Sequence, residues 1–147
     1  MIYAKVIRGH GVASGKGKDR RYPRGTLFLQ LPYFADLGLD LTHYFRGTIN
    51  IDIRPYHFEI RKPAYRMEGI KWSTHIPAEN FFFFDAEIIH EEISYEGYIY
   101  MPDPETKTDH FQPLHMLELI MPEVLNLKYG STIELKVKPP QIRLYKN

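Results

Sequence analysis

The chain has 147 residues, of which 44% are hydrophobic and 25% are charged, with a formal net charge of +1 and no cysteine. This composition predicts one folded domain and argues against disorder, because the apolar surface is large enough to offset the entropy lost on folding. It also excludes disulfides, cysteine nucleophiles and cysteine-ligated zinc. No apolar run approaches the ~20 residues of a membrane helix, and the start of the chain lacks a signal peptide, so we expect a cytoplasmic protein with no membrane partner.

Runs of alternating, β-branched or aromatic residues predict strands through most of the chain. In chain order these runs are 2–7, 26–31, 48–53, 81–89, 93–101 and 132–137. Short helices are predicted around 34–42 and 123–127, and 11 prolines would interrupt longer ones,. The pattern predicts a mainly β architecture, a barrel with long connections. Residues 1–138 are expected to form one domain, followed by a loose tail over 139–147, although Ile142 and Leu144 could instead add an edge strand.

Glycines and cations follow the first strand in the segment GHGVASGKGKDRR, at 9–21. Glycine lets backbone N–H groups approach a phosphate closely, and lysines would balance its charge. Residues 1–24 hold seven Lys or Arg against one acidic residue, whereas 79–105 hold eight carboxylates and no Lys or Arg. A basic end of the chain suits an anionic partner such as a phosphate group. The alternative for the glycine segment is a plain flexible surface loop. The alternative for the segregated charges is two solvated faces or a like-signed surface loop.

The segment GTINIDI, at 47–53, is predicted to be a strand with two different faces. Its three isoleucines would enter the core, while Thr48, Asn50 and Asp52 would share the other face. Hydroxyl and amide oxygens are hard donors that suit Mg²⁺ shared with substrate phosphates. The alternative is an ordinary half-exposed strand with its polar residues outward. Asp52 could either strengthen the metal site or form a salt bridge with Arg54 or Arg46.

Polar residues of the segment 107–131 offer a third candidate site. A zinc site on His110 and His115 is disfavoured, because no third ligand stands at a typical spacing. If 117–121 is a strand, Glu118 lies on the face opposite Leu117 and Leu119. Most such carboxylates simply reach solvent.

Several short motifs occur in an order that is typical of one enzyme family. They are Val-Ala-Ser-Gly-Lys-Gly at 12–17, Leu-Pro-Tyr at 31–33, Gly-Thr-Ile-Asn-Ile at 47–51, Lys-Thr-Asp-His at 107–110, Glu-Leu-Ile-Met-Pro at 118–122 and Leu-Lys-Tyr-Gly at 127–130. In this order and approximate spacing they resemble the CTP-dependent riboflavin kinases typical of archaea, over about residues 2–138. The resemblance implies a cradle-loop β-barrel with one or two short helices.

The resemblance also implies roles for individual residues. Thr48 and Asn50 would bind Mg²⁺, and Thr108 and Glu118 would contact the flavin. The nucleotide CTP, as phosphate donor, would be held by Gly15, Lys16, Gly17, Lys18 and, in its cytidine part, by Glu123, Val124 and Leu125. The sequence departs from the family pattern at an arginine-rich insertion, 18–25.

The function implied is transfer of the γ-phosphate of CTP to the ribityl hydroxyl of riboflavin, giving FMN. Such a transfer needs in-line positioning and neutralised charge, and Glu118 would accept the hydroxyl proton or anchor the flavin. This hypothesis requires Thr48 and Asn50 to meet the glycine loop across a shared cleft. The competing hypothesis is a non-catalytic module on the same barrel that binds flavin, a nucleotide or a protein. A less favoured third is a single-stranded nucleic-acid surface that uses the basic loop, Tyr22 and Tyr33.

Overall fold

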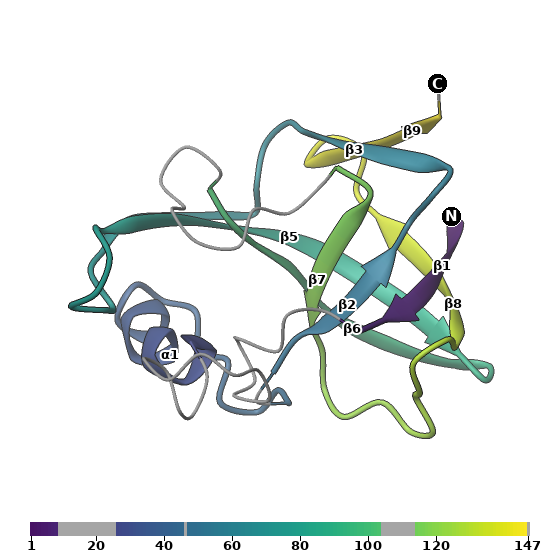
Figure 1. Cartoon of the computed structure of the whole chain (residues 1–147), viewed down its shortest axis with the longest axis horizontal. Helices are drawn as coiled ribbons and strands as arrows, with labels where there is room; N and C mark the ends of the chain where they lie inside the picture. Colours follow the sequence, from purple (N-terminus) through teal and green to yellow (C-terminus); the bar gives the residue numbers. More distant parts are fainter. Residues whose placement is uncertain (9–25, 46, 104–113, 147) are drawn as a thin grey trace.

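Six antiparallel strands close into a barrel (Figure 1). The computed structural model describes residues 1–8, 26–45, 47–103 and 114–146. In order around the barrel the strands are β1 (Ile2–Ile7), β2 (Ile49–Asp52), β7 (Met116–Ile120), β6 (Ile93–Pro102), β5 (Glu79–His90) and β8 (Thr132–Val137), and β8 pairs with both β5 and β1. A further strand, β4 (Tyr65–Ile70), extends the sheet beyond β5. The predicted mainly β barrel is confirmed.

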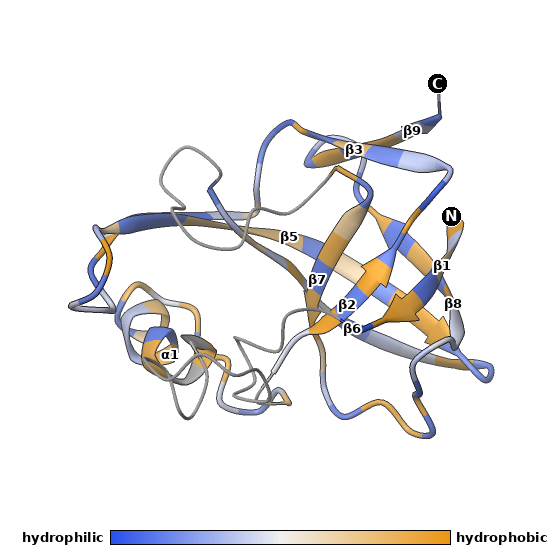
Figure 2. Ribbon diagram, in the orientation of Figure 1, coloured by the Kyte–Doolittle hydropathy of each residue, from blue (hydrophilic) through white to orange (hydrophobic). Residues whose placement is uncertain are grey.

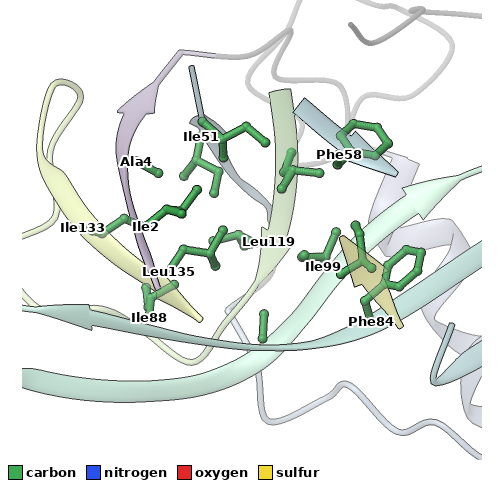
Figure 3. Packing of buried hydrophobic residues seen from close by; sticks show 14 of the residues in the cluster. Ile2, Ala4, Ile51, Phe58, Phe84, Ile88, Ile99, Leu119, Ile133 and Leu135 are labelled. Carbon is green, nitrogen blue, oxygen red and sulfur yellow. The ribbon is translucent and has the colours of Figure 1, made fainter. Parts of the chain in front are cut away.

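Side chains of alternate residues fill the barrel, as the period of two in the sequence predicts. Figure 2 shows hydrophobic and hydrophilic residues alternating along β1 and β8. Figure 3 shows the inward side chains meeting from strands all around the barrel. The labelled members of this core are Ile2, Ala4, Ile51, Phe58, Phe84, Ile88, Ile99, Leu119, Ile133 and Leu135.

The phenylalanine run at 81–84 lies in β5, which buries both of its faces. Phe82 and Phe84 belong to the core inside the barrel, whereas Phe81 and Phe83 belong to a second core on the outside. The helix α1 (Thr26–Asp36) covers this second core with Leu27 and Phe34. Because each face of this part of β5 meets a separate apolar layer, the sequence at 81–84 is continuously apolar,.

The strand predicted over 26–31 is wrong, because this segment forms the first half of α1. Leu27 and Phe34 are almost fully buried, with Leu31 partly buried between them. The spacing of four and then three residues is that of a helix face. The locally β-like sequence therefore takes the conformation that lets this face cover the second core.

The helix predicted around 34–42 is observed only up to Asp36. Gly38 ends it with a φ of +102°. Two backbone hydrogen bonds close the end, from Gly38 N to Ala35 O at 3.0 Å and from Leu39 N to Phe34 O at 2.9 Å. These bonds form a Schellman motif, in which glycine adopts the left-handed backbone at the lowest cost.

A two-stranded sheet of β3 (Tyr56–Ile60) and β9 (Ile142–Lys146) lies at one end of the barrel (Figure 1). Ile142 is fully buried, and Phe58 joins it in the barrel core. Of the two expectations for the chain after residue 138, the additional strand is the one observed. The sequence did not predict β3 or β4.

The described residues contain no helix that combines the length and the apolar character needed to cross a membrane. The one helix in this part of the chain, α1, has 11 residues. Such a helix is about 17 Å long at 1.5 Å per residue, well short of the ~30 Å hydrocarbon core of a bilayer.

Candidate functional site

Outward-facing residues of three neighbouring barrel strands form one continuous row. Asn50 of β2 lies opposite Glu118 of β7, and Glu118 lies opposite Tyr100 of β6. The predicted faces of β2 are confirmed, since Ile51 and Ile53 are fully buried in the barrel. Side chains directly opposite each other on antiparallel strands have Cβ atoms about 4.5–5.5 Å apart. The row therefore brings an amide, a carboxylate and a phenol together.

Thr48 joins this row through a direct hydrogen bond. Its hydroxyl, Oγ1, donates to Oε2 of Glu118 at 3.0 Å, across a sequence separation of 70 residues. The bond is partly buried, where a charge-assisted hydrogen bond is stronger than in water,. The two residues predicted to bind Mg²⁺ and the residue predicted to act on the acceptor thus belong to one cluster, which we call the Thr48–Glu118 cluster (Thr48, Asn50 and Glu118).

The donor set of the Thr48–Glu118 cluster fits Mg²⁺. It offers a hydroxyl, an amide oxygen and a carboxylate, all hard oxygen donors. The Thr48 hydroxyl is the donor in its hydrogen bond to Glu118, so the lone pairs of its oxygen can still bind a metal ion,. In the described part of the chain, no three or more His, Cys, Asp and Glu residues gather in a way that could hold a metal ion. The cluster would therefore leave most of the metal's coordination positions to water and substrate phosphates.

Asp52, the third polar residue on the outer face of β2, is engaged by Arg54. Two hydrogen bonds from the guanidinium reach Oδ2 at 2.5 and 2.9 Å, and the Arg54 backbone N–H donates to Oδ1 at 2.9 Å. Hydrogen bonds from Arg54 lower the pKa of Asp52 below its ordinary value. Of the two roles open to Asp52 from sequence, the salt bridge with Arg54 is the one observed.

Tyr100 and its hydrogen-bond partner were missed by the sequence reading. Tyr100 is 3% exposed and Gln30 of α1 is 2% exposed, and the phenol hydroxyl donates to Gln30 Oε1. Burial raises the pKa of Tyr100 well above its usual value, and the carboxylates of Glu118 and Glu79 raise it further. The phenol therefore keeps its proton at neutral pH. A sequence signal did exist, because Gln30 stands on an otherwise apolar helix face.

A group of three tyrosines, Tyr44, Tyr65 and Tyr98, lies beside the Thr48–Glu118 cluster, two residues further along β7 from Glu118. Tyr98 of β6 lies opposite Ile120, two residues after Glu118 on β7. The rings of Tyr44 and Tyr65 each lie 6.0 Å from the ring of Tyr98, measured between centroids. Partial burial, together with the neighbouring tyrosines and Asp85, raises the pKa of Tyr98 to about 12. The group is neutral, aromatic and partly exposed, which suits contact with a planar ring.

The segment predicted to contact the cytidine lies elsewhere on the barrel. Residues 123–127 do not form the predicted helix; they contain a turn at 125–126, where Asn126 has a φ of +60°. Val124 packs against the barrel core, whereas Glu123 and Leu125 are exposed. The Leu125 N–H donates to the Tyr95 hydroxyl at 3.3 Å. Tyr95 is five residues before Tyr100 on β6, roughly 17 Å along an extended strand. The contact with a nucleotide stays a prediction.

Other residues of the predicted site lie outside the described residues. They are Gly15, Lys16, Gly17 and Lys18 of the glycine loop, and Thr108 of the predicted flavin contact. Their roles stay predictions, as does the meeting of the glycine loop with Thr48 and Asn50. The described part of the site is therefore the metal and acceptor side of the predicted centre.

Comparison with known proteins supplies no family for the chain. A scan against protein-family models found no match, and a search of curated proteins also found none.

Proposed function

We propose that the chain is a phosphotransferase of the riboflavin kinase type, which moves the γ-phosphate of a nucleoside triphosphate, CTP in the first place, to the ribityl hydroxyl of riboflavin. The observation that carries this proposal is the Thr48–Glu118 cluster. Its hydroxyl and carboxylate are joined by a 3.0 Å hydrogen bond, with Asn50 directly opposite Glu118. The proposed metal ligands, Thr48 and Asn50, and the residue proposed to act on the acceptor, Glu118, come from distant parts of the sequence and lie together on one face of the barrel.

Thr48 and Asn50 would hold Mg²⁺ through their side-chain oxygens. When bound, the ion would neutralise charge on the transferring phosphates. The protein's own part is to hold Asn50 on the outer face of β2 and Thr48 immediately before that strand. Because β2 is hydrogen-bonded to β1 and to β7, Asn50 is fixed before any ligand arrives, and the side-chain hydrogen bond to Glu118 fixes Thr48,.

Glu118 would act on the acceptor alcohol. Its carboxylate accepts the proton of the ribityl hydroxyl as that oxygen bonds to the γ-phosphorus, while the bond from phosphorus to the β-phosphate oxygen breaks. The products are the phosphate ester and a nucleoside diphosphate. The hydrogen bond from Thr48 holds one carboxylate oxygen, Oε2, and so orients the carboxylate,.

The tyrosine group beside the cluster supports a planar aromatic acceptor. Tyr65 is 37% exposed, and Tyr44 and Tyr98 are partly exposed. Rings of this kind bind an aromatic system through edge and face contacts, each worth about 0.5–1.5 kcal/mol. A flavin ring placed against them would be within reach of Glu118 through its ribityl chain.

The test is turnover of riboflavin to FMN with Mg²⁺ and, separately, CTP, ATP and GTP. We expect product with at least one nucleotide, and we expect Thr48→Val to reduce kcat at least about a hundredfold, because the metal and Glu118 each lose a contact. Thr48→Ser keeps the hydroxyl and should retain most of the activity. Thr132→Val, at an exposed position on β8, controls for the loss of a surface hydroxyl.

Two results would overturn the proposal. The first is thermal stabilisation by riboflavin without product from any nucleotide, which would make the chain a binding module rather than an enzyme. The second is equal turnover by Thr48→Val and Thr48→Ser, which would remove the Thr48–Glu118 cluster from the reaction.

A further inference from the structure

Tyr100 lies between the Thr48–Glu118 cluster and the helix α1. It is opposite Glu118 across the β6–β7 ladder, and its hydroxyl donates to Gln30 of α1. Its ring stacks on that of Phe81, with the ring centroids 5.8 Å apart and an interplanar angle of 19°. It also makes an edge-to-face contact with the ring of Phe34, with the centroids 6.4 Å apart. The ring plane and the hydroxyl direction are therefore both fixed.

The bond between Tyr100 and Gln30 is a directional contact of α1 within a largely apolar core. The second core joins Leu27 and Phe34 of α1 to the outer face of β5, and apolar contacts of this kind do not fix direction,. A buried hydrogen bond does, because a shift that leaves the donor or the acceptor unpaired has a large desolvation cost. Of the α1 side chains that the structure describes, Gln30 is the one that is both polar and buried.

Glu118 is held between two neighbours along the row. On the β2 side, Thr48 donates to its carboxylate at 3.0 Å. On the β6 side stands Tyr100, close enough for the Glu118 charge to act on the phenol. A ring that cannot rotate or shift limits the positions open to the carboxylate beside it.

We infer that Gln30 and Tyr100 are positioning residues for the proposed phosphotransfer: their hydrogen bond fixes α1 against β6 and thereby fixes the place of the Glu118 carboxylate. The inference rests on the proposed function for its effect on the reaction. Neither residue needs to touch a substrate. A displacement of about 1 Å in a reacting group can cost about a hundredfold in rate.

If the hydrogen bond between Tyr100 and Gln30 only stabilised the fold, the variants would behave differently. Removing one partner would then lower stability, and removing both partners together would restore stability and activity alike. Replacing both members of a buried hydrogen bond by apolar groups of similar shape can be nearly neutral for folding. The double variant therefore separates the two roles.

The experiment compares Tyr100→Phe, Gln30→Met and the double variant. We expect each single change to lower the Tm by several degrees, because one buried polar group loses its partner, and the double variant to return to within about 3 °C of the parent protein. We expect the double variant still to show a kcat at least about tenfold below the parent, with the KM for riboflavin changed less than about threefold. Tyr3→Phe, at a residue that is 68% exposed on β1, controls for the loss of a phenol hydroxyl.

A second readout keeps the inference separate from the proposed function. Amide hydrogen exchange of α1 and of β6 and β7 around Tyr100 and Glu118 should be about tenfold faster in the double variant despite its recovered Tm. Product formation by the parent protein tests the proposed function alone. Unchanged exchange in the double variant, or a kcat that recovers together with the Tm, would overturn the positioning role whether or not the parent is a kinase.

Discussion

At Glu118, charge and hydrogen bonding can be separated by one substitution. Glu118→Gln keeps an oxygen that can accept the hydrogen bond from Thr48, which is 3.0 Å long in the native protein, but it removes the negative charge,. If the carboxylate accepts the proton of the acceptor alcohol, kcat should fall about a hundredfold or more while the Tm changes by only a few degrees. Steady-state kinetics with riboflavin and thermal unfolding measure the two effects.

Glu118→Asp is the matched control, because it retains the charge but shortens the side chain. It should keep more activity than Glu118→Gln if proton acceptance matters most. An amide variant as active as the parent protein would exclude Glu118 as the base and leave it only an anchoring role.

The Asp52–Arg54 pair predicts a defined pH dependence of stability. The pKa of Asp52 is lowered in the folded protein, first of all by the hydrogen bonds from Arg54. A lowered folded-state pKa contributes stability that is present above the unfolded value of about 3.9 and is lost as the pH falls through the folded value. Asp52→Asn should therefore lower the Tm at pH 7, and the difference from the parent should shrink as the pH falls below about 3.9 and through the lowered folded-state value,. The Tm difference should stay below about 3 °C, since exposed ion pairs contribute little.

A salt titration of the same pair of proteins checks the physical cause. High salt screens exposed charges, so it should reduce the Tm difference at pH 7. A difference that persists at low pH would mean that Asp52 stabilises the turn after β2 by some route other than its charge.

At the scale of secondary-structure elements, Gly97 of β6 lies directly against the backbone at the end of β7. A Cβ atom on Gly97 would lie 2.1 Å from the carbonyl oxygen of Ile120 and 2.7 Å from the sulfur of Met121. The backbone oxygen cannot move aside without disturbing β7, the strand that carries Glu118. Gly97→Ala should therefore destabilise the protein by about 3 kcal/mol or more, as measured by urea denaturation.

Gly69 in β4 offers a matched glycine without a close neighbour. A Cβ there would meet nothing within 4 Å, although its φ of +66° is unfavourable for alanine. Gly69→Ala should cost only about 1 kcal/mol, from backbone strain. Equal losses at the two positions would show that β6 and β7 can separate without cost.

At the scale of the whole molecule, the barrel could be predicted because its strands show a period of two. The bounds of β1 and β8 match the predicted runs, since one face of each strand meets the core and the other meets solvent. The helix α1 could not be predicted in this way, because Leu27 and Phe34 cover a core formed by residues far along the chain. Tertiary packing there overrides local propensity.

The candidate site was predictable residue by residue but not as an arrangement. Alternation along β2 placed Thr48 and Asn50 on one face, and alternation along β7 placed Glu118 outward. Thr48 and Glu118 are 70 residues apart in the sequence, and their hydrogen bond depends on the pairing register of β2 and β7. Such a register is set by the closure of the whole barrel, which no local pattern encodes.

The sheet of β3 and β9 shows how the end of the chain contributes to the stability of the whole molecule. Ile142 is fully buried in the barrel core, together with Phe58 of β3. Ile142→Ala should therefore cost about 2–5 kcal/mol, because it leaves a cavity in a packed core, and it should lower the Tm by roughly 5–15 °C. Arg143→Ala, at the next and exposed residue of the same strand, should cost less than about 1 kcal/mol,. Thermal and urea unfolding of both variants measure the two losses of stability. If β9 were peripheral to the barrel core, both variants would lose equally little stability.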